Sequence, residues 1–303
     1  MQRWPDRVYG EIAIADPGLL ALIACPTFRR LEQIRQAGPS ALAFPFKTVT
    51  RFEHSLGVYH LLGRLGAGGR EQVAGLLHDV SHTAFSHAAD FLYTSDEQNH
   101  HEGLKPEFLH RPDLEAAIRG LGFEPEDFYD DTVFPLLEQP LPWLCADRLD
   151  YFLRDSLACA VSTPESVART LAHVAVRDGR IVLTDAEVAR DAARRFAIMN
   201  DDWWASPTEA YIYNEFADAL REGFRLGALH EDDLLTDDDA VLTRLAATPS
   251  PLIAAKLARI THFRPERVNG YVPRVIPKVR RIDPPVAVNG GWRRLSELGM
   301  PDG

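Results

Sequence analysis

Residues 74–90 read AGLLHDVSHTAFSHAAD and place three histidines and two aspartates within seventeen positions. Histidine is sparse elsewhere, since seven of the eleven histidines lie between positions 54 and 101. Imidazole serves both as a metal ligand and as a proton carrier near neutral pH. The clustering therefore predicts a metal site or an acid–base site in this part of the chain, and the helices that present it decide the fold.

The adjacent pair His78-Asp79 limits how this stretch folds. Neighbouring residues on a helix point about 100° apart, so both side chains reach one ion only near a helix end or a helix junction. The following Val80-Ser81-His82 is typical of such a junction. A mixed set of imidazole and carboxylate ligands suits a divalent transition ion with open positions for water and phosphate.

The segments on either side of this stretch predict a mainly helical chain. Apolar spacing predicts short helices over 51–66, 70–79 and 83–93, a helix over 143–158, and further helices over 185–204, 207–226, 236–247 and 250–261. A helix is also expected from Leu19 to Gln36, with a break at Pro26. The remaining signals are β: a short strand in VYGEIAIADP (8–17), a hairpin around Asp178-Gly179, and one or two edge strands in the valine- and proline-rich residues 268–288.

Three segments together resemble a known family, the HD-domain metal-dependent phosphohydrolases. RFEHSLGV (51–58), HDVSHTAFSHAAD (78–90) and DRLDYFLRD (147–155) match, in order, the segments of its deoxynucleoside triphosphate triphosphohydrolase branch. The resemblance covers residues 7–226 and, more weakly, the tail. It implies an HD-domain helical bundle with small β-hairpin and edge-strand additions. We expect residues 1–230 to form this domain and residues 231–303 a helical and β-rich extension packed on the same body.

The resemblance also implies roles for individual residues. One divalent ion (Mn, Mg, Fe or Ni) is expected, and its implied ligands are His54, His78, Asp79 and Asp147. The implied catalytic residues around the scissile phosphate are His82, His87, Asp90, His101 and Glu102. The implied substrate contacts are Arg51, Arg148, Tyr151 and Asp155. His87 is the candidate acid for the leaving oxygen, because Asp90 lies three residues on and can orient its ring.

The function that the resemblance implies is hydrolysis of a nucleotide, as in the deoxynucleoside triphosphate triphosphohydrolases. Residues 190–215 depart from that branch, because the positions where tyrosines and a histidine are usual are occupied by Asn200, Asp201, Asp202, Trp203, Trp204 and Ser206. Two carboxylates there would repel a polyphosphate at a cost on the order of 1 kcal/mol per close pair. A hydrolase of nucleoside monophosphates or other small phosphoesters is therefore an alternative. An alternative of another class is a non-catalytic nucleotide-sensing HD module, which predicts damage to catalytic histidines that are present here.

Composition limits the classes of binding partner and the cellular location that we expect for the chain. The net charge of -11 argues against binding to nucleic acid or to an anionic membrane. The N-terminal stretch has no signal peptide or membrane span, and three cysteines without CxxC spacing fit a reducing compartment, so a cytoplasmic protein is expected. A homo-oligomer is expected, with the apolar tail and Trp203-Trp204 as candidate interface. The basic run PKVRR (277–281) is interpreted as a solvated strand edge.

Overall fold

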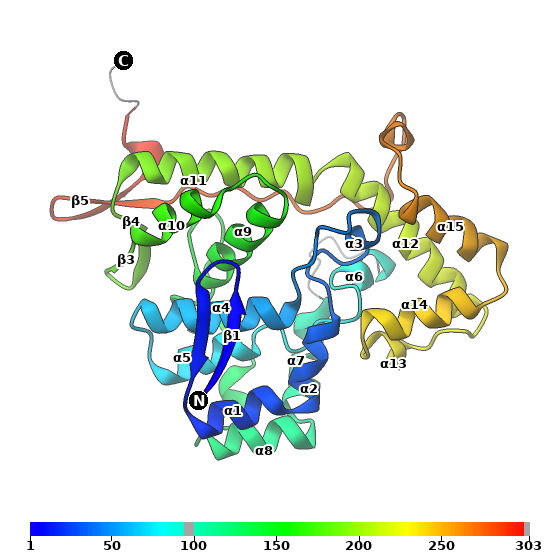
Figure 1. Ribbon diagram of the computed structural model, residues 1–303, viewed down its shortest axis with the longest axis horizontal. Helices are drawn as coiled ribbons and strands as arrows, with labels where there is room; N and C mark the ends of the chain where they lie inside the picture. The colour runs from blue at the N-terminus through cyan, green and yellow to red at the C-terminus, as the bar shows by residue number, and fades with distance from the viewer. Residues whose placement is uncertain (94–99, 300–303) are drawn as a thin grey trace.

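The computed structural model describes residues 1–93 and 100–299. Its first half consists of a β-hairpin followed by mostly short helices (Figure 1). The elements are β1 (Gln2–Asp6), β2 (Gly10–Ile14), α1 (Pro17–Ala24), α2 (Pro26–Arg29), α3 (Ser40–Ala43), α4 (Arg51–Arg64), α5 (Gly69–Leu77), α6 (Ala88–Tyr93), α7 (His100–Leu109), α8 (Pro112–Gly120) and α9 (Ala146–Ala158).

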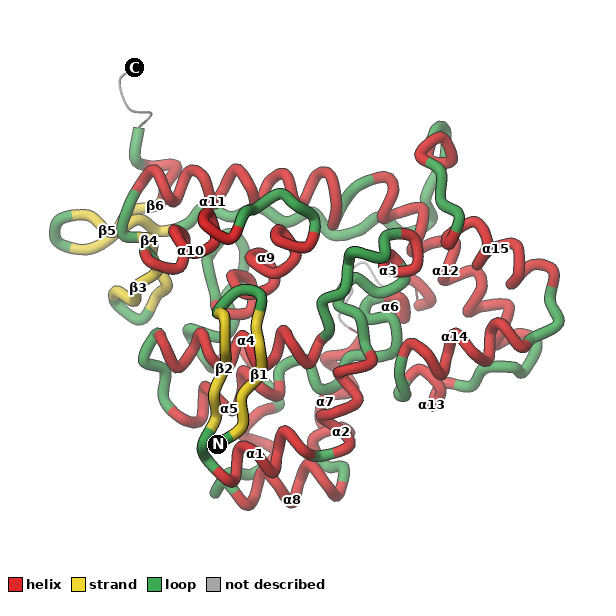
Figure 2. Tube along the Cα trace, in the orientation of Figure 1, coloured by secondary structure: helices red, strands yellow, loops and turns green. Residues whose placement is uncertain are grey.

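The second half adds longer helices at one end of the molecule and a small sheet at the other (Figures 1 and 2). The elements are α10 (Pro164–Ala172), β3 (Val174–Arg177), β4 (Arg180–Leu183), α11 (Ala186–Ile198), a π-helical turn (Met199–Trp204), α12 (Pro207–Arg225), α13 (Glu231–Leu234), α14 (Asp238–Ala247), α15 (Pro251–Thr261), β5 (Pro285–Val288) and β6 (Gly291–Arg294). The expected mainly helical fold with small β additions is confirmed.

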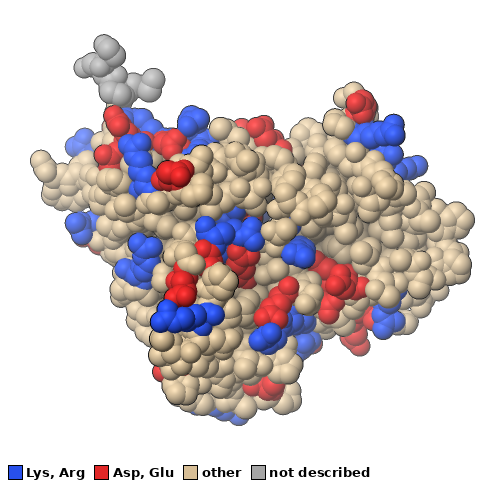
Figure 3. Space-filling model, in the orientation of Figure 1, with Lys and Arg blue, Asp and Glu red and all other residues tan. Residues whose placement is uncertain are grey.

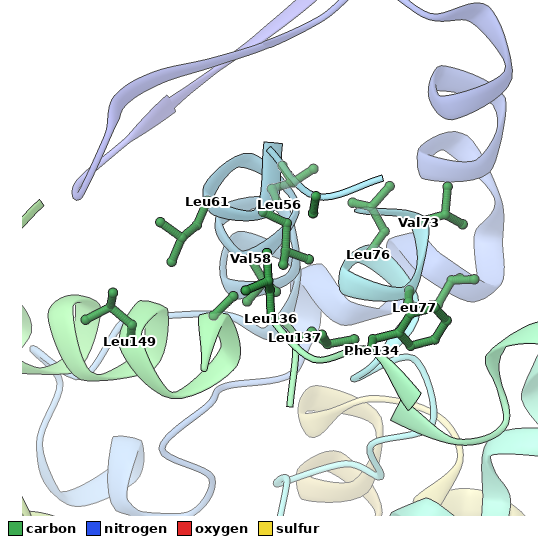
Figure 4. Packing of buried hydrophobic residues seen from close by; sticks show 14 of the residues in the cluster. Leu56, Val58, Leu61, Val73, Leu76, Leu77, Phe134, Leu136, Leu137 and Leu149 are labelled. Atoms are coloured by element: carbon green, nitrogen blue, oxygen red, sulfur yellow. The ribbon is translucent and has the colours of Figure 1, made fainter. Parts of the chain in front are cut away.

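Helix α4 is the centre of the first half, because it packs against both α5 and α9. Thr50 caps it by accepting a hydrogen bond from the backbone N–H of Glu53 at 3.1 Å. Figure 4 shows leucine and valine side chains of α4 and α5 meeting Phe134, Leu136 and Leu137, with Leu149 of α9 beside them. These apolar contacts fix the three elements that carry the expected metal ligands.

The loop before α6 differs from the helix expected over 83–93. The helix begins only at Ala88, and Phe85 and Ser86 have φ values of 59° and 53°. The cause is tertiary: Asp238 accepts a hydrogen bond from the backbone N–H of Phe85 at 2.5 Å, and the Ser86 hydroxyl donates to the carbonyl oxygen of Arg35 at 2.7 Å. Contacts with residues far along the chain therefore override local helix propensity.

The β elements agree with the sequence in part. The hairpin around Asp178-Gly179 is present as β3 and β4. The N-terminal strand has a partner, β1, that the sequence analysis did not include. In the tail only residues 285–288 pair, parallel to β4 through Leu183 and Val286, so β5 lies inside the order β3-β4-β5-β6. The edge-strand interpretation of residues 268–284 is therefore wrong.

Helices α14 and α15 pack against α12 at the end of the molecule away from the sheet. The boundary expected at residue 230 stays a prediction. Among residues 1–93 and 100–299, the structure has no helix that is both long enough and apolar enough to cross a membrane.

Candidate metal centre

Three helices bring the four expected metal ligands together. His54 lies in α4, His78 is the C-cap residue directly after α5, Asp79 follows it, and Asp147 lies in the first turn of α9. Helix α5 ends at Leu77, so the His78-Asp79 pair occupies a helix end, as its spacing predicts.

The ligating atoms converge within a few ångströms. His54 Nε2 lies 2.9 Å from Asp147 Oδ1 and 3.2 Å from His78 Nε2. Asp79 Oδ2 lies 3.7 Å from His54 Nε2, and Asp79 Oδ1 lies 3.6 Å from His78 Nε2. His54, His78 and Asp79 are buried at their side chains, while the Asp147 side chain is 21% exposed. The site is thus closed on one side and open to solvent or substrate at Asp147.

The hydrogen-bonding pattern of the two rings fits a cation. His78 Nδ1 lies 2.9 Å from the carbonyl oxygen of Gly75, which only accepts, so Nδ1 carries the proton and the neutral ring presents a lone pair at Nε2. His54 Nδ1 lies 2.8 Å from the buried Asp150 carboxylate and has the same arrangement. The Nε2 atoms of His54 and His78 therefore lie close to the carboxylates of both Asp79 and Asp147. Acceptors gathered in a buried site require a positive charge between them, and a divalent ion supplies it.

The pKa shifts at the centre also indicate that this site favours positive charge. Burial by itself lowers the pKa of His54, but its hydrogen bonds to Asp147 and Asp150 outweigh this and raise the pKa to about 10. Burial raises the pKa of Asp79, while the neighbouring Arg51, His78 and His82 hold it well below its usual value. The carboxylate is therefore ionised and available as a ligand.

A buried ion-pair network behind the centre orients His54. Asp150 accepts from His54, from Arg154 Nε at 2.5 Å and from the Tyr9 hydroxyl at 2.8 Å. Arg154, fully buried, also contacts Asp6 Oδ2 at 2.8 Å and Glu53 Oε1 at 3.1 Å. The sequence analysis did not assign these residues, although Asp150 and Arg154 lie four apart in DRLDYFLRD, a spacing that pairs them on one helix face.

Gly57 is required by this network. A Cβ atom at Gly57 would lie 1.9 Å from Arg154 Nη2 and 2.2 Å from Asp150 Oδ2. The glycine in RFEHSLGV therefore gives α9 its close approach to α4.

Of the candidate catalytic residues, His82 lies beside the expected ligand Asp79, and His87 and Asp90 follow next to it. His82 Nε2 is 3.3 Å from Asp79 Oδ1, and its ring centroid is 5.0 Å from that of His87. His87 Nδ1 is 2.9 Å from the buried Asp90 carboxylate, which orients the ring as the sequence predicts. Glu102 is exposed in the first turn of α7, and the side chain of His101 lies outside the described residues. The catalytic roles of all five residues stay predictions.

A pocket adjoins the centre and contains three of the four expected substrate contacts. It is lined by Arg51, Tyr151 and Asp155, together with His87. Arg51 donates to Asp79 Oδ2 at 2.7 Å and to the Ser86 hydroxyl at 3.0 Å, so it joins the pocket to the centre. Asp155 accepts from Trp204 Nε1 at 2.9 Å.

Arg148 does not line this pocket. Its Nη1 donates to the carbonyl oxygens of Gln139 at 2.9 Å and Trp143 at 2.7 Å, and its Nη2 lies 3.3 Å from Glu138. The resemblance implies that Arg148 contacts phosphate. The geometry argues against this prediction. Backbone carbonyls of the loop before α9 take its donors instead.

The remaining pocket wall comes from residues that the sequence analysis left unassigned or interpreted differently. It consists of aromatic and charged side chains, chiefly Lys47, Phe91, Trp203, Trp204, Glu209, Tyr213 and Arg280. The tryptophan pair therefore lines the pocket. Asp201 and Asp202, by contrast, are exposed and do not line it, and Asp201 pairs with Arg281 at 2.6 Å. The repulsion expected from these two carboxylates is wrong, because the π-helical turn directs them to the surface.

The surface carries charges of both signs. On the face shown in Figure 3, Lys and Arg side chains alternate with Asp and Glu side chains, and neither sign covers a broad area. This face offers no continuous basic groove for a nucleic-acid backbone.

The chain is similar in sequence or in fold to several known proteins. The model of the HD domain family matches residues 51–132. The "Metal-dependent phosphohydrolase cns2" of Cordyceps militaris is 34% identical over 295 residues, which cover 94% of this chain and 85% of that protein. The "Deoxynucleoside triphosphate triphosphohydrolase SAMHD1" of Danio rerio is 37% identical over 108 residues, 31% of this chain and 17% of that protein. The crystal structure of a hypothetical protein from Aquifex aeolicus has the same fold, with a TM-score of 0.68, 22% identity, and coverage of 98% and 92%.

Proposed function

Because the chain belongs to the HD-domain metal-dependent phosphohydrolases, we propose that it hydrolyses a phosphoester or phosphoanhydride bond of a nucleotide. The observation that carries the choice of a nucleotide is the aromatic pocket next to the metal centre. The Tyr151 ring centroid lies 6.4 Å from that of His54 and 5.3 Å from that of Trp204. A phosphate at the centre thus places the rest of the molecule among aromatic side chains, which stack on bases.

The proposed mechanism assigns a task to each group around the phosphate. His54, His78, Asp79 and Asp147 would hold a divalent ion, which would supply Lewis-acid neutralisation of charge on the phosphoryl oxygens. Arg51 adds a fixed positive charge beside Asp79. Water attacks phosphorus as the P–O bond to the leaving group breaks; His87, held by Asp90, protonates the leaving oxygen, and the attacking water gives up its proton to solvent. Mn, Mg, Fe and Ni all suit two imidazoles and two carboxylates, so the identity of the ion stays a prediction.

Two nucleotide classes are candidates. The partial match to SAMHD1 supports a deoxynucleoside triphosphate, but it covers only 31% of the chain. The pocket charges support a nucleoside monophosphate. Lys47 is paired with Glu209 at 3.3 Å and Arg51 with Asp79 at 2.7 Å, so little positive charge is left for a polyphosphate. We therefore favour the monophosphate. The cytoplasmic location and the homo-oligomer stay predictions.

The test is a substrate panel. Metal-free protein is reloaded with Mn²⁺ or Mg²⁺ and incubated with nucleoside tri-, di- and monophosphates, and the products are separated by chromatography. The His78→Ala/Asp79→Ala variant is the blank. Orthophosphate from monophosphates alone supports the favoured substrate, and nucleoside plus intact triphosphate supports the other. Absence of any product that depends on His78 and Asp79 contradicts a nucleotide substrate.

A further inference from the structure

An extended segment of the C-terminal part, residues 274–281, passes the pocket; we call it the strap. It joins the end of the molecule with α15 to the end with β5 and runs on the side where α11 lies (Figure 2). Asn214 Oδ1 accepts from the backbone N–H groups of Arg274 at 3.2 Å and Val275 at 3.1 Å, and its Nδ2 donates to the Val275 carbonyl oxygen at 2.8 Å. Asn200 Oδ1 accepts from the backbone N–H of Arg280 at 2.6 Å.

These two asparagines fix the strap at defined positions along its length. Asn200 and Asn214 are 1% and 3% exposed, so their amides would be left unsatisfied if the strap moved away. The strap is not a strand, but its backbone is hydrogen-bonded to side chains of α12 and the π-helical turn. Residues of the strap that line the pocket are therefore held in position before a ligand binds.

The three arginines of the strap have different surroundings. Arg274 pairs with Asp218 at 3.0 Å and Arg281 pairs with Asp201 at 2.6 Å, both at the surface. Arg280, half-buried, lines the pocket with Pro277. Its Nη1 donates to the carbonyl oxygen of Lys278 at 3.2 Å, and within residues 1–93 and 100–299 no carboxylate lies at ion-pair distance from it.

Arg280 thus differs from the other cations of the pocket, Lys47 and Arg51, which both pair with carboxylates. The positive charge of Arg280 affects the pKa values of other residues that line the pocket. Burial raises the pKa values of the Tyr151 and Tyr213 hydroxyls, and the positive charge of Arg280 opposes this at both. Both tyrosines line the same pocket. An unpaired guanidinium, held by its backbone and facing a pocket beside a metal centre, is suited to bind an anion through two parallel hydrogen bonds.

We propose that Arg280 binds the phosphate of the substrate, so that the strap supplies a substrate-binding residue to the metal-dependent site. This proposal rests on the proposed function, because it takes the pocket to be the site of the phosphoester. Among the described residues that line the pocket, Arg280 is the lysine or arginine without a paired carboxylate, and one such charge matches one phosphate group.

The experiment compares Arg280→Gln and Arg280→Lys with Arg281→Gln, a matched control on the same strap. Binding of AMP, adenosine and inorganic phosphate is measured by calorimetry with and without added Mn²⁺, and kcat and KM are measured on the substrate that the panel identifies. Arg280→Gln should weaken binding of AMP by about tenfold to a hundredfold, since a hydrogen bond to a charged group is lost. Adenosine, which lacks phosphate, should change less than about twofold because its contacts remain.

The conservative variant and the control separate charge from structure. Arg280→Lys keeps the charge without the planar fork and should recover part of the AMP affinity. Arg281→Gln should leave both ligands unaffected, and thermal unfolding of all three variants should match the wild-type protein. Equal loss of AMP and adenosine binding in Arg280→Gln would mean a structural role and overturn the proposal.

Failure of this proposal is distinguishable from failure of the proposed function. If wild-type protein binds AMP and the substrate panel is positive, unchanged AMP affinity in Arg280→Gln overturns only the role of Arg280. If wild-type protein binds neither AMP nor inorganic phosphate and the panel is negative, the proposed function is wrong and the role of Arg280 is wrong with it.

Discussion

The metal centre and the pocket adjoin each other, yet they are built in different ways. Behind the centre lies a chain of buried charges that runs from His54 through Asp150 to Arg154, Asp6 and Glu53. The pocket wall instead combines aromatic side chains, among them Trp203 and Trp204, with charged side chains such as Lys47 and Arg280. Removing one member of a buried ion pair leaves an uncompensated charge, whereas an aromatic wall can be altered with small cost. The ion-binding part therefore tolerates little change, whereas the substrate part can vary.

The largest effect is expected at a proposed ligand. Asp147→Ala should lower hydrolysis by about a thousandfold or more, since the ion contributes several kcal/mol of charge stabilisation in the transition state. Metal content measured by mass spectrometry should fall with activity. Asp201→Ala, a surface carboxylate outside the pocket, is the control and should retain both. Full activity in Asp147→Ala would show that the centre does not hold the ion.

A smaller loss, of metal affinity, is expected at Asp150, which contacts the proposed ligand His54 but is not itself a proposed ligand. Asp150→Asn removes the charge that orients His54 through Nδ1 and should weaken metal affinity about tenfold to a hundredfold. The measurement is a competitive metal titration against a chelator. Metal affinity within about twofold of wild type would contradict an orienting role for this carboxylate.

The network behind the centre can be tested through two glycines of α4. Gly57→Ala places a methyl group against Arg154 and Asp150 and should cost about 1–3 kcal/mol of unfolding free energy. Gly63→Ala meets only the end of the flexible Gln72 side chain, 3.3 Å away, and should be neutral or stabilise the helix by up to about 1 kcal/mol. Urea unfolding of both variants gives the difference, and equal stabilities would contradict the close packing of α4 on α9.

The smallest effect is expected in the pocket wall. Trp204→Phe keeps the ring stacking but loses the hydrogen bond to Asp155, and should raise KM about fivefold. Metal affinity should not change, which separates the two regions. Trp292→Phe, far from the pocket in β6 and packed on Trp143, is the control and should leave KM unchanged. A lower metal affinity in Trp204→Phe would mean that the two regions are not independent.

The sequence predicted the metal side better than the substrate side for a physical reason. His54, His78, Asp79 and Asp147 lie in the three short contiguous segments that carry the family resemblance, and the contact between His87 and Asp90 follows from local spacing. The turn at Phe85 and Ser86 depends on Asp238, and no local pattern reveals it. Likewise, nothing adjacent to Arg148 shows that backbone carbonyls take its donors.

The pocket wall was the least predictable part. Its residues come from positions 36 to 280, and their common position exists only once α12, the π-helical turn and the strap have packed. From the sequence alone, the basic run at 277–281 is interpreted as a solvated strand edge, because the protein as a whole is acidic. Arg280 faces the pocket because Asn200 and Asn214 accept hydrogen bonds from the backbone of the strap. Both asparagines are far from the strap in sequence.

The late position of the strap in the chain has a consequence for biosynthesis. A ribosome adds about 5–20 residues per second, so residues 274–281 follow Asp155 by roughly 6 to 24 seconds. The nascent chain therefore contains all four proposed ligands before it contains the strap. For the same reason, proteolysis between α15 and the strap leaves the ligands in one fragment and Arg280 in the other. Such a cut would separate the capacity to hold an ion from the capacity to hold a phosphate.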